Sequence, residues 1–219
     1  MSSPAPASAG WTGQKGRPTR LLLLRHGQTA MSAARRYSGR GDPELTELGL
    51  AQAQAVAAGI HTIDGAGSTG VVLCSPLGRA QQTAEPVAKA LGVPVTTHDG
   101  LLETDFGVWD GLTFPEARER DPELHARWLG DETVPPPGGE SFADVGRRIA
   151  VLRDEVLAAY AGQTVMLVSH VTPIKMLLRL ALDVGPTLLY RLHLDLASLS
   201  VADFYADGGA SVRLVNRTF

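Results

Sequence analysis

The feature of this sequence that most constrains its fold is the alternation of short apolar runs with longer helical patterns. Apolar runs that predict buried strands occupy residues 21–24, 71–74, 93–97 and 164–168, and two further strands are expected at 199–205 and 211–215. Helical patterns begin at Thr46, at Ser141 and at Pro173, and also cover residues 77–91 and 114–129. Strands that alternate with helices predict an α/β fold, with a mainly parallel central sheet flanked by helices on both faces.

Periodicity assigns a buried face to two of these helices. In the helix that begins at Thr46, one side carries Leu48, Ala51, Ala55 and Ala58. In the helix that begins at Ser141, a capping-box pair with Asp144 precedes an apolar stripe of Phe142, Val145, Ile149, Leu152 and Val156. Prolines interrupt the other patterns, so we expect a bend or a break at Pro86 and a break near Pro122.

Residues 1–19 differ in composition from the rest of the chain. They are rich in small residues and proline and show no apolar periodicity, which is typical of a flexible linker or tail. The remaining residues, 20–219, have a suitable length for one α/β domain. We therefore expect a linker or tail followed by a single folded domain.

Charge and hydropathy exclude several classes of function. The net charge of −3 argues against broad binding of nucleic acids or of membrane surfaces. No stretch approaches the roughly 18 apolar residues of a membrane span. The single cysteine, Cys74, can form neither an internal disulfide nor a CxxC metal site. We expect a cytoplasmic domain with no metal and no cofactor, which attracts any anionic ligand by local charges.

Two histidines stand where expected strands end. His26 follows the first strand within Arg25-His26-Gly27, and His170 follows the strand at 164–168. Ligands of such folds bind beyond the carboxyl ends of the strands. The planar guanidinium of Arg25 suits phosphate oxygens, Gly27 lets the backbone approach a ligand closely, and a neutral imidazole is a plausible nucleophile. These residues predict a phosphate site.

Arg79 and Glu103 extend this pattern. Arg79 stands near the start of the helix at 77–91, and Glu103 lies in a glycine-rich loop. Taken alone, each is most simply a solvated surface side chain. Phosphoryl transfer, however, requires positive charge around the phosphoryl oxygens and a proton for the leaving alcohol. A nucleotide-binding domain is disfavoured, because the sequence has neither GxGxxG nor a P-loop.

In their order along the chain, these pieces resemble the histidine phosphatase superfamily, which also includes the cofactor-dependent phosphoglycerate mutases. The matching segments are residues 25–29, 37–39, 45–49, 74–76, 79–84, 103–111, 138–141 and 168–170. They run from Leu21 to about residue 200, so the resemblance covers nearly all of the chain except the first twenty residues.

The resemblance implies a role for each matching residue. His26 would become phosphorylated, Arg25, Arg79 and His170 would form the phosphate pocket, and Glu103 would be the proton donor, with Asp105 as its rival. Further substrate- or phosphate-binding positions would be Gln28, Thr29, Ser32, Ser38, Gly39 and Val171. The resemblance implies no metal at this site.

The sequence departs from the family pattern at two places. Ser32 stands where the family often has an asparagine, and its hydroxyl has a shorter reach. Val171-Thr172 replaces the Gly-Gly pair that often follows the second histidine. Both departures bear on the substrate more than on the class of reaction.

Within the family, residues 37–40 and 106–111 look most like the α-ribazole phosphatase-like group. The run 169–175 is similar to versions fused behind a ribonuclease H domain, and the composition of residues 1–19 fits the linker of such a fusion. The resemblance implies an amino-terminal ribonuclease H domain as a partner in the full-length protein. We expect a metal-independent phosphomonoesterase that acts through a phosphohistidine on a small phosphorylated metabolite, with α-ribazole 5′-phosphate as a candidate. The alternatives are a phosphoglycerate mutase-type phosphotransferase and a non-catalytic module that binds phosphate esters.

Overall fold

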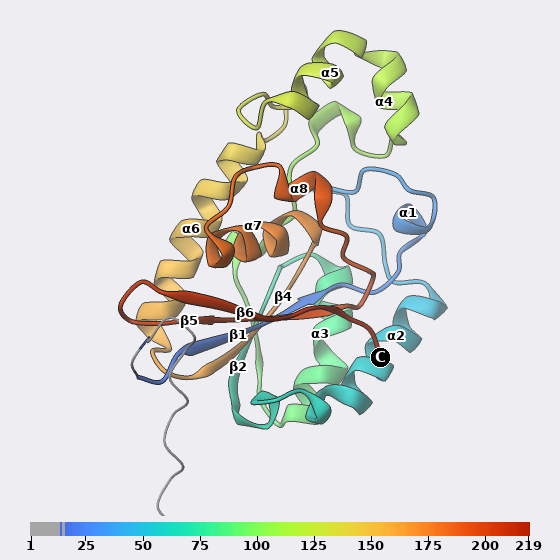
Figure 1. Ribbon diagram of the computed structural model, residues 1–219. Helices are drawn as coiled ribbons and strands as arrows, with labels where there is room; N and C mark the ends of the chain where they lie inside the picture. Colours follow the sequence, from blue (N-terminus) through green and yellow to red (C-terminus); the bar gives the residue numbers. More distant parts are fainter. Residues whose placement is uncertain (1–13, 15) are drawn as a thin grey trace, which may run out of the picture.

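A six-stranded sheet forms the centre of the protein in the computed structural model, which describes residue 14 and residues 16–219 (Figure 1). Most of the expected linker or tail, residues 1–13 and 15, lies outside the described residues. The strands are β1 (Thr19–Arg25), β2 (Thr69–Cys74), β3 (Val95–Thr97), β4 (Thr164–Ser169), β5 (Leu199–Phe204) and β6 (Ala210–Arg217). Their order is β3-β2-β4-β1-β5-β6; the first four pair in parallel, and β5 pairs antiparallel with both β1 and β6. The prediction of a mainly parallel sheet is confirmed.

Helices connect these strands. The α-helices are α1 (Ala30–Ala33), α2 (Glu47–Gly59), α3 (Gly78–Leu91), α4 (Phe114–Arg120), α5 (Pro122–Gly130), α6 (Phe142–Ala159), α7 (Val171–Leu182) and α8 (Leu188–Arg191). Short 3₁₀ turns are η1 (Ile60–Thr62), η2 (Ala66–Ser68), η3 (Asp99–Leu101) and η4 (Gly107–Trp109). Among the described residues, no helix has both the length and the apolar character needed to cross a bilayer.

Both faces of the sheet are covered, and β1 shows why. Its four leucines are fully buried, and they alternate between two cores. Leu21 and Leu23 pack in the core that contains residues of α6 and α7, whereas Leu22 and Leu24 pack in the core that contains residues of α2 and α3. Burial of each such side chain stabilises the fold by about 1.5–3 kcal/mol. Figure 1 shows the two helical layers on opposite sides of the sheet.

The apolar stripe predicted for α6 is buried, but the face predicted for α2 is wrong. Leu48 is 53% exposed, and the residues that α2 buries are Gly49, Ala53, Val56 and Ala57. Alanines stand on two opposite sides of this helix, so periodicity alone does not select between them. A close backbone contact determines which face of α2 is buried, because a Cβ on Gly27 would lie 2.6 Å from the carbonyl oxygen of Gly49.

The two prolines have different effects. Pro86 does not break α3, which continues to Leu91 and ends at Gly92 in the left-handed region. Pro86 is followed by Val87 and Ala88, which are buried in the core beneath β2, and this packing offsets the missing backbone hydrogen bond. The break expected near Pro122 is present, since α4 ends at Arg120 and α5 begins at Pro122.

The start of α7 and the presence of α1 and α8 differ from expectation. Helix α7 begins at Val171, two residues before Pro173, which still lies in the first turn where a missing N–H costs little. The short helices α1 and α8 lie in segments where no helix was expected.

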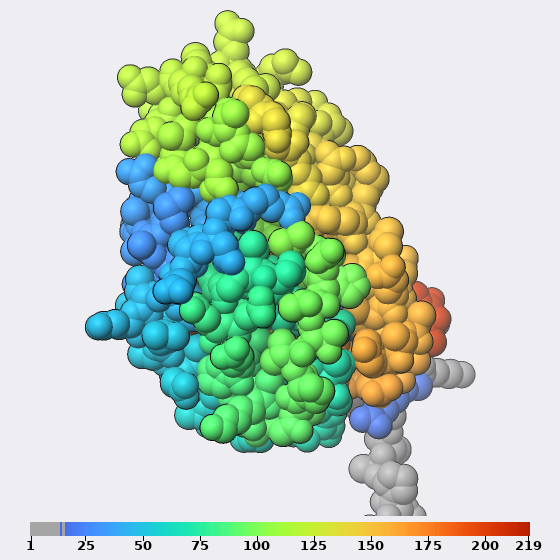
Figure 2. Space-filling view, turned by 180° about the vertical axis from the view of Figure 1, so that it is seen from behind, coloured from blue at the N-terminus to red at the C-terminus, as the bar shows by residue number. Residues whose placement is uncertain are grey.

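Helices α4 and α5 form one end of the molecule in both views (Figures 1 and 2).

Candidate active site

A cavity of about 650 Å³ opens beyond the carboxyl end of β1. The strand register brings the two histidines close together, because Arg25 of β1 pairs with Ser169 of β4. The next residues of the two strands, His26 and His170, therefore leave the sheet side by side, with ring centroids 5.1 Å apart. The roof is apolar and aromatic and comes from separate segments: Phe106, Phe114, Trp128, Leu129, Phe142 and Leu189.

His26 presents one ring nitrogen to this cavity. Its Nδ1 lies 2.8 Å from the carbonyl oxygen of Gly27, and a carbonyl can only accept, so Nδ1 carries the proton. Nε2 therefore holds the lone pair. Burial, followed by the charges of Arg25 and Arg79, keeps the pKa of His26 well below its usual value. The side chain is thus a neutral imidazole with a nucleophilic Nε2.

Two guanidinium groups, one partly and one fully buried, lie close to this ring. Arg25 donates from Nη1 to the carbonyl oxygen of Leu194 at 2.6 Å, and burial lowers its pKa to about 10. Arg79 is fully buried and donates to the carbonyl oxygens of Gly41 and Gly39 at 2.7 and 2.9 Å. The Nε of each arginine is buried and has no partner within the described part of the chain. Because buried donors are normally paired, these two groups mark an anion site.

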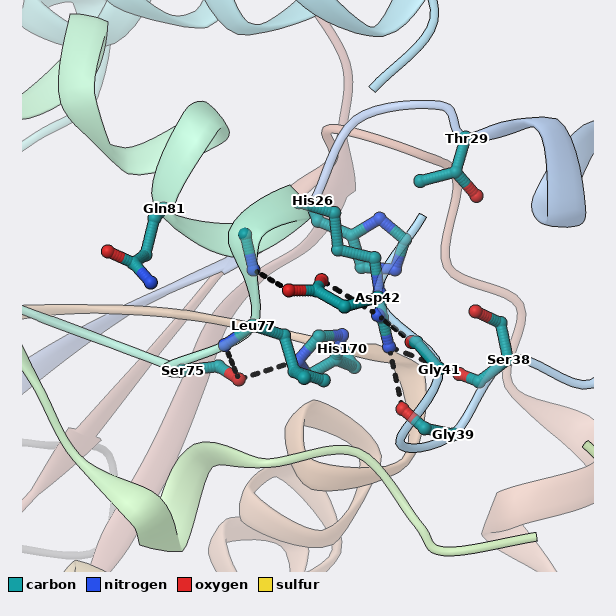
Figure 3. A network of polar contacts seen from close by, with 12 residues as sticks. His26, Thr29, Ser38, Gly39, Gly41, Asp42, Ser75, Leu77, Gln81 and His170 are labelled. Carbon is teal, nitrogen blue, oxygen red and sulfur yellow. Dashed lines mark hydrogen bonds and ion pairs between the residues drawn. The ribbon is translucent and has the colours of Figure 1, made fainter. Parts of the chain in front are cut away.

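His170 and Ser38 contribute two more unpaired polar atoms. His170 is fully buried, its Nε2 lies 2.8 Å from Ser75 Oγ, and its Nδ1 has no partner among the described residues (Figure 3). Burial, followed by His26 and Arg79, lowers the pKa of His170 well below its usual value. Ser38 lines the cavity with a buried hydroxyl that is likewise unpaired in the described structure.

The structure distinguishes the two candidate carboxylates by position. Glu103 lines the cavity, is 6% exposed, and accepts from the backbone N–H groups of Thr104 at 2.8 Å and Thr172 at 3.5 Å. Asp105 does not line the cavity; its Oδ1 accepts from the Gly107 N–H at 2.8 Å. Of the two, Glu103 alone is placed to exchange a proton with a ligand in the cavity.

The remaining predicted residues divide into two groups. Ser32 and Val171 line the cavity, although the Ser32 hydroxyl already donates to the Thr29 carbonyl at 2.9 Å in the capping box of α1. Three others do not line it: Gln28 accepts from Thr46, Thr29 caps α1, and Gly39 donates its N–H to Asp110.

Sequence reasoning missed a lysine at this site. Lys175 lines the cavity and donates from Nζ to the carbonyl oxygen of Leu189 at 2.6 Å. Burial and the nearby Arg25 lower its pKa. The spacing of four residues from Val171, on one face of α7, is a signal that could have identified it. Arg35, Arg36 and Tyr37 also line the cavity and were missed.

This arrangement can bind and transfer a phosphoryl group. Arg25, His26 and Glu103 line the cavity, whereas Arg79 and His170 do not line it and lie fully buried close to His26. Together these residues place hydrogen-bond donors and a carboxyl group around a nucleophilic nitrogen. Within residues 14 and 16–219, no three or more histidine, cysteine or acidic side chains form a group that could hold a metal ion.

Comparison with known proteins agrees with this chemistry. The sequence profile of the histidine phosphatase superfamily (branch 1) matches residues 21–217. A bifunctional protein of Mycobacterium tuberculosis is 60% identical over 218 residues, which are 100% of this chain and 59% of that protein. The chain thus spans about three fifths of the length of this curated relative.

Solved structures share the fold. A mycobacterial glucosyl-3-phosphoglycerate phosphatase superposes with a TM-score of 0.81 at 29% identity, covering 92% of this chain and 100% of that one. The α-ribazole phosphatase of Shigella flexneri superposes with a TM-score of 0.80 at 28% identity, covering 91% of this chain and 96% of that one.

Proposed function

Because the chain belongs to the histidine phosphatase superfamily (branch 1), we propose that it is a metal-independent phosphomonoesterase that forms a phosphohistidine at His26. Membership makes it a phosphatase or phosphotransferase; hydrolysis through His26 is the more specific proposal. The observation that carries it is the neutral His26 ring, whose Nε2 is left free by the bond from Nδ1 to Gly27, beside two guanidinium groups whose buried Nε–H donors have no partner among the described residues.

In the first step, Arg25, Arg79 and His170 hold the phosphoryl oxygens. Nε2 of His26 attacks phosphorus, a P–N bond forms and the P–O bond to the alcohol breaks. Protonated Glu103 gives its proton to the leaving oxygen. The Gly27 carbonyl, which accepts from Nδ1, stabilises the positive charge that the ring acquires.

In the second step, water replaces the alcohol. The Glu103 carboxylate takes a proton from the attacking water, the P–N bond breaks and inorganic phosphate leaves. His26 returns to its neutral form and Glu103 is protonated again, so the cycle closes. Both steps use Arg25, His26 and Glu103, which line the cavity, together with Arg79 and His170, which lie buried close to His26.

The roof supports a substrate whose alcohol contains a ring. Phe106, Trp128 and Phe142 line the cavity and offer flat apolar surfaces. The α-ribazole phosphatase of Shigella flexneri shares this fold, so α-ribazole 5′-phosphate is the first substrate that we propose to test. We also propose that the protein is cytoplasmic, that a ribonuclease H domain precedes this domain in the full-length protein, and that this domain itself binds no nucleic acid. One curated relative is described as bifunctional, and this chain covers 59% of its length, which leaves room for a second domain.

The test is phosphate release in the presence of a chelator. The panel is α-ribazole 5′-phosphate, 3-phosphoglycerate, a sugar phosphate and p-nitrophenyl phosphate, with wild type, His26→Ala, and His61→Ala as a control at an exposed, remote histidine. We expect release with wild type and His61→Ala and none with His26→Ala. Conversion of 3-phosphoglycerate to its isomer without phosphate release would instead indicate a mutase, and binding without turnover a non-catalytic module.

A further inference from the structure

The second histidine of the site is held by a residue to which no role has been assigned so far. Ser75 follows β2, and its hydroxyl oxygen lies 2.8 Å from Nε2 of His170 (Figure 3). The two residues directly follow neighbouring strands, because β2 pairs with β4 and the Ser75 N–H donates to the Val168 carbonyl at 2.9 Å. Both side chains are fully buried. The contact is therefore rigid and shielded from water.

The hydroxyl proton of Ser75 has one acceptor in reach. The other polar contact of Ser75 Oγ, to the Leu77 N–H at 3.4 Å, uses the oxygen as an acceptor. No further partner of this hydroxyl is present among the described residues, and a buried hydroxyl proton rarely stays unpaired. The Ser75 hydroxyl accordingly donates to His170, and Nε2 of His170 is the acceptor.

This assignment fixes the remaining proton of the neutral ring. If Nε2 accepts, the single proton of the imidazole is on Nδ1. That atom is buried, has no partner within the described residues, and belongs to a ring beside His26 and Arg79. Nδ1–H can therefore donate to a phosphoryl oxygen, whereas the opposite tautomer would direct a lone pair at the anion.

We propose that Ser75 is a positioning residue, whose hydroxyl holds His170 in the Nδ1–H tautomer so that His170 donates to the transferred phosphoryl group. This inference rests on the proposed function, since it assigns a phosphoryl oxygen as the acceptor. Ser75 touches neither the substrate nor His26; it acts through His170 alone.

The tautomer can be measured directly by ¹⁵N–¹H NMR of the imidazole nitrogens of His170. We expect Nδ1–H in wild type and in Ser75→Thr, which keeps the hydroxyl, and a shift towards Nε2–H in Ser75→Ala. A wild-type ring protonated on Nε2 would overturn the proposal. The wild-type spectrum reports the tautomer of His170 without any turnover. It therefore tests the proposal even if the activity proposed above is not found or if Ser75→Ala fails to fold.

A double-mutant cycle tests whether Ser75 acts through His170. Ser75→Ala should lower kcat/KM for p-nitrophenyl phosphate and affinity for inorganic phosphate by about tenfold or more, the size expected when a buried donor is misplaced. In the His170→Ala background the same change should cost less than about twofold, because the group it orients is gone. An equal loss in both backgrounds would show a merely structural role and would contradict the proposal. Loss of hydrolysis in His26→Ala, measured in parallel, tests the proposed function separately.

Discussion

At the scale of single residues, the bonds that each side chain already makes determine which atom is free for a ligand. The Gly27 carbonyl occupies Nδ1 of His26 and leaves Nε2. Backbone carbonyls occupy Nη1 of Arg25 and both Nη atoms of Arg79, and within the described residues the Nε of each arginine has no partner. A phosphoryl group would complete the hydrogen bonds that the protein leaves open. The site is thus preorganised for an anion before the ligand arrives.

Replacing a carboxyl group by an amide should show whether Glu103 or Asp105 is the proton donor. We expect Glu103→Gln to slow hydrolysis of alkyl phosphates by about 10²–10⁴-fold and of p-nitrophenyl phosphate far less, because a phenolate leaves without a proton. Asp105→Asn is the matched control and should have little effect, since its carboxylate faces Gly107. Equal slowing of both substrate classes by Glu103→Gln would remove the donor role.

The low pKa of His26 predicts a dependence on pH. Burial lowers the folded-state pKa below the ordinary 6.5, so the folded protein binds this proton only at a lower pH than the unfolded chain does. The nucleophile should remain neutral below pH 6.5, and the free energy of unfolding should fall as the pH drops below 6.5, because the unfolded state then takes up more protons. An NMR titration of His26 with a midpoint at or above 6.5 would contradict this account.

The sequence predicted which residues gather at the site better than which atoms they offer. Arg25, His26 and Glu103 were identified from their order and residue type, and all three line the cavity. Arg79 and His170 were identified in the same way; they lie fully buried close to His26 and do not line the cavity. Their roles remain predictions. Thr29 and Lys175 show the limit of this reasoning, because only the fold turns Thr29 to cap α1 and directs Lys175 into the cavity.

At the scale of elements, strand register and one helix contact place the site. β1 and β4 run parallel in register, which sets His26 beside His170, and α2 packs its first turn against the backbone that follows His26. Periodicity predicted the buried stripe of α6 correctly, because most of its large apolar residues lie on one side, with Val151 as an exposed exception. It failed for α2, where small residues surround the helix and tertiary contact selects the face.

A matched pair of substitutions tests which face of α2 is buried. Val56→Ala removes buried methyl groups from the core beneath the sheet and should lower the free energy of unfolding by about 2 kcal/mol. Leu48→Ala, at a side chain 53% exposed, should change it by less than about 0.5 kcal/mol. Chemical denaturation of the two variants gives both values, and a reversed order would show that the predicted face is buried after all.

Gly49 provides a second test at this scale. A Cβ there would overlap the carbonyl oxygen of Gln28, in the loop directly after His26, so Gly49→Ala must move α2 or that loop. We expect lower stability together with at least a tenfold loss in kcat. Gly67→Ala is the control, since a Cβ at Gly67 meets no atom within 4 Å. Unchanged kcat in Gly49→Ala would mean that the contact does not position His26.

At the scale of the whole molecule, a sheet edge supplies the chemistry and distant segments supply the roof. The alternation of strands and helices predicted the sheet and the edge where its ligand binds. It could not predict the roof, because Trp128, Phe142 and Leu189 come from three separate helices and meet only in the folded protein. This division explains why the class of reaction is easier to infer from the sequence than the alcohol of the substrate.

The most direct test of the central claim is to trap the phosphorylated enzyme. Wild type and His26→Ala are mixed with a labelled phosphomonoester, quenched in alkali during turnover, digested and analysed by mass spectrometry. We predict a phosphoryl group on the peptide that contains His26 in wild type, and neither phosphopeptide nor phosphate release in His26→Ala. Hydrolysis by wild type without a phosphopeptide, together with full activity in His26→Ala, would contradict the account.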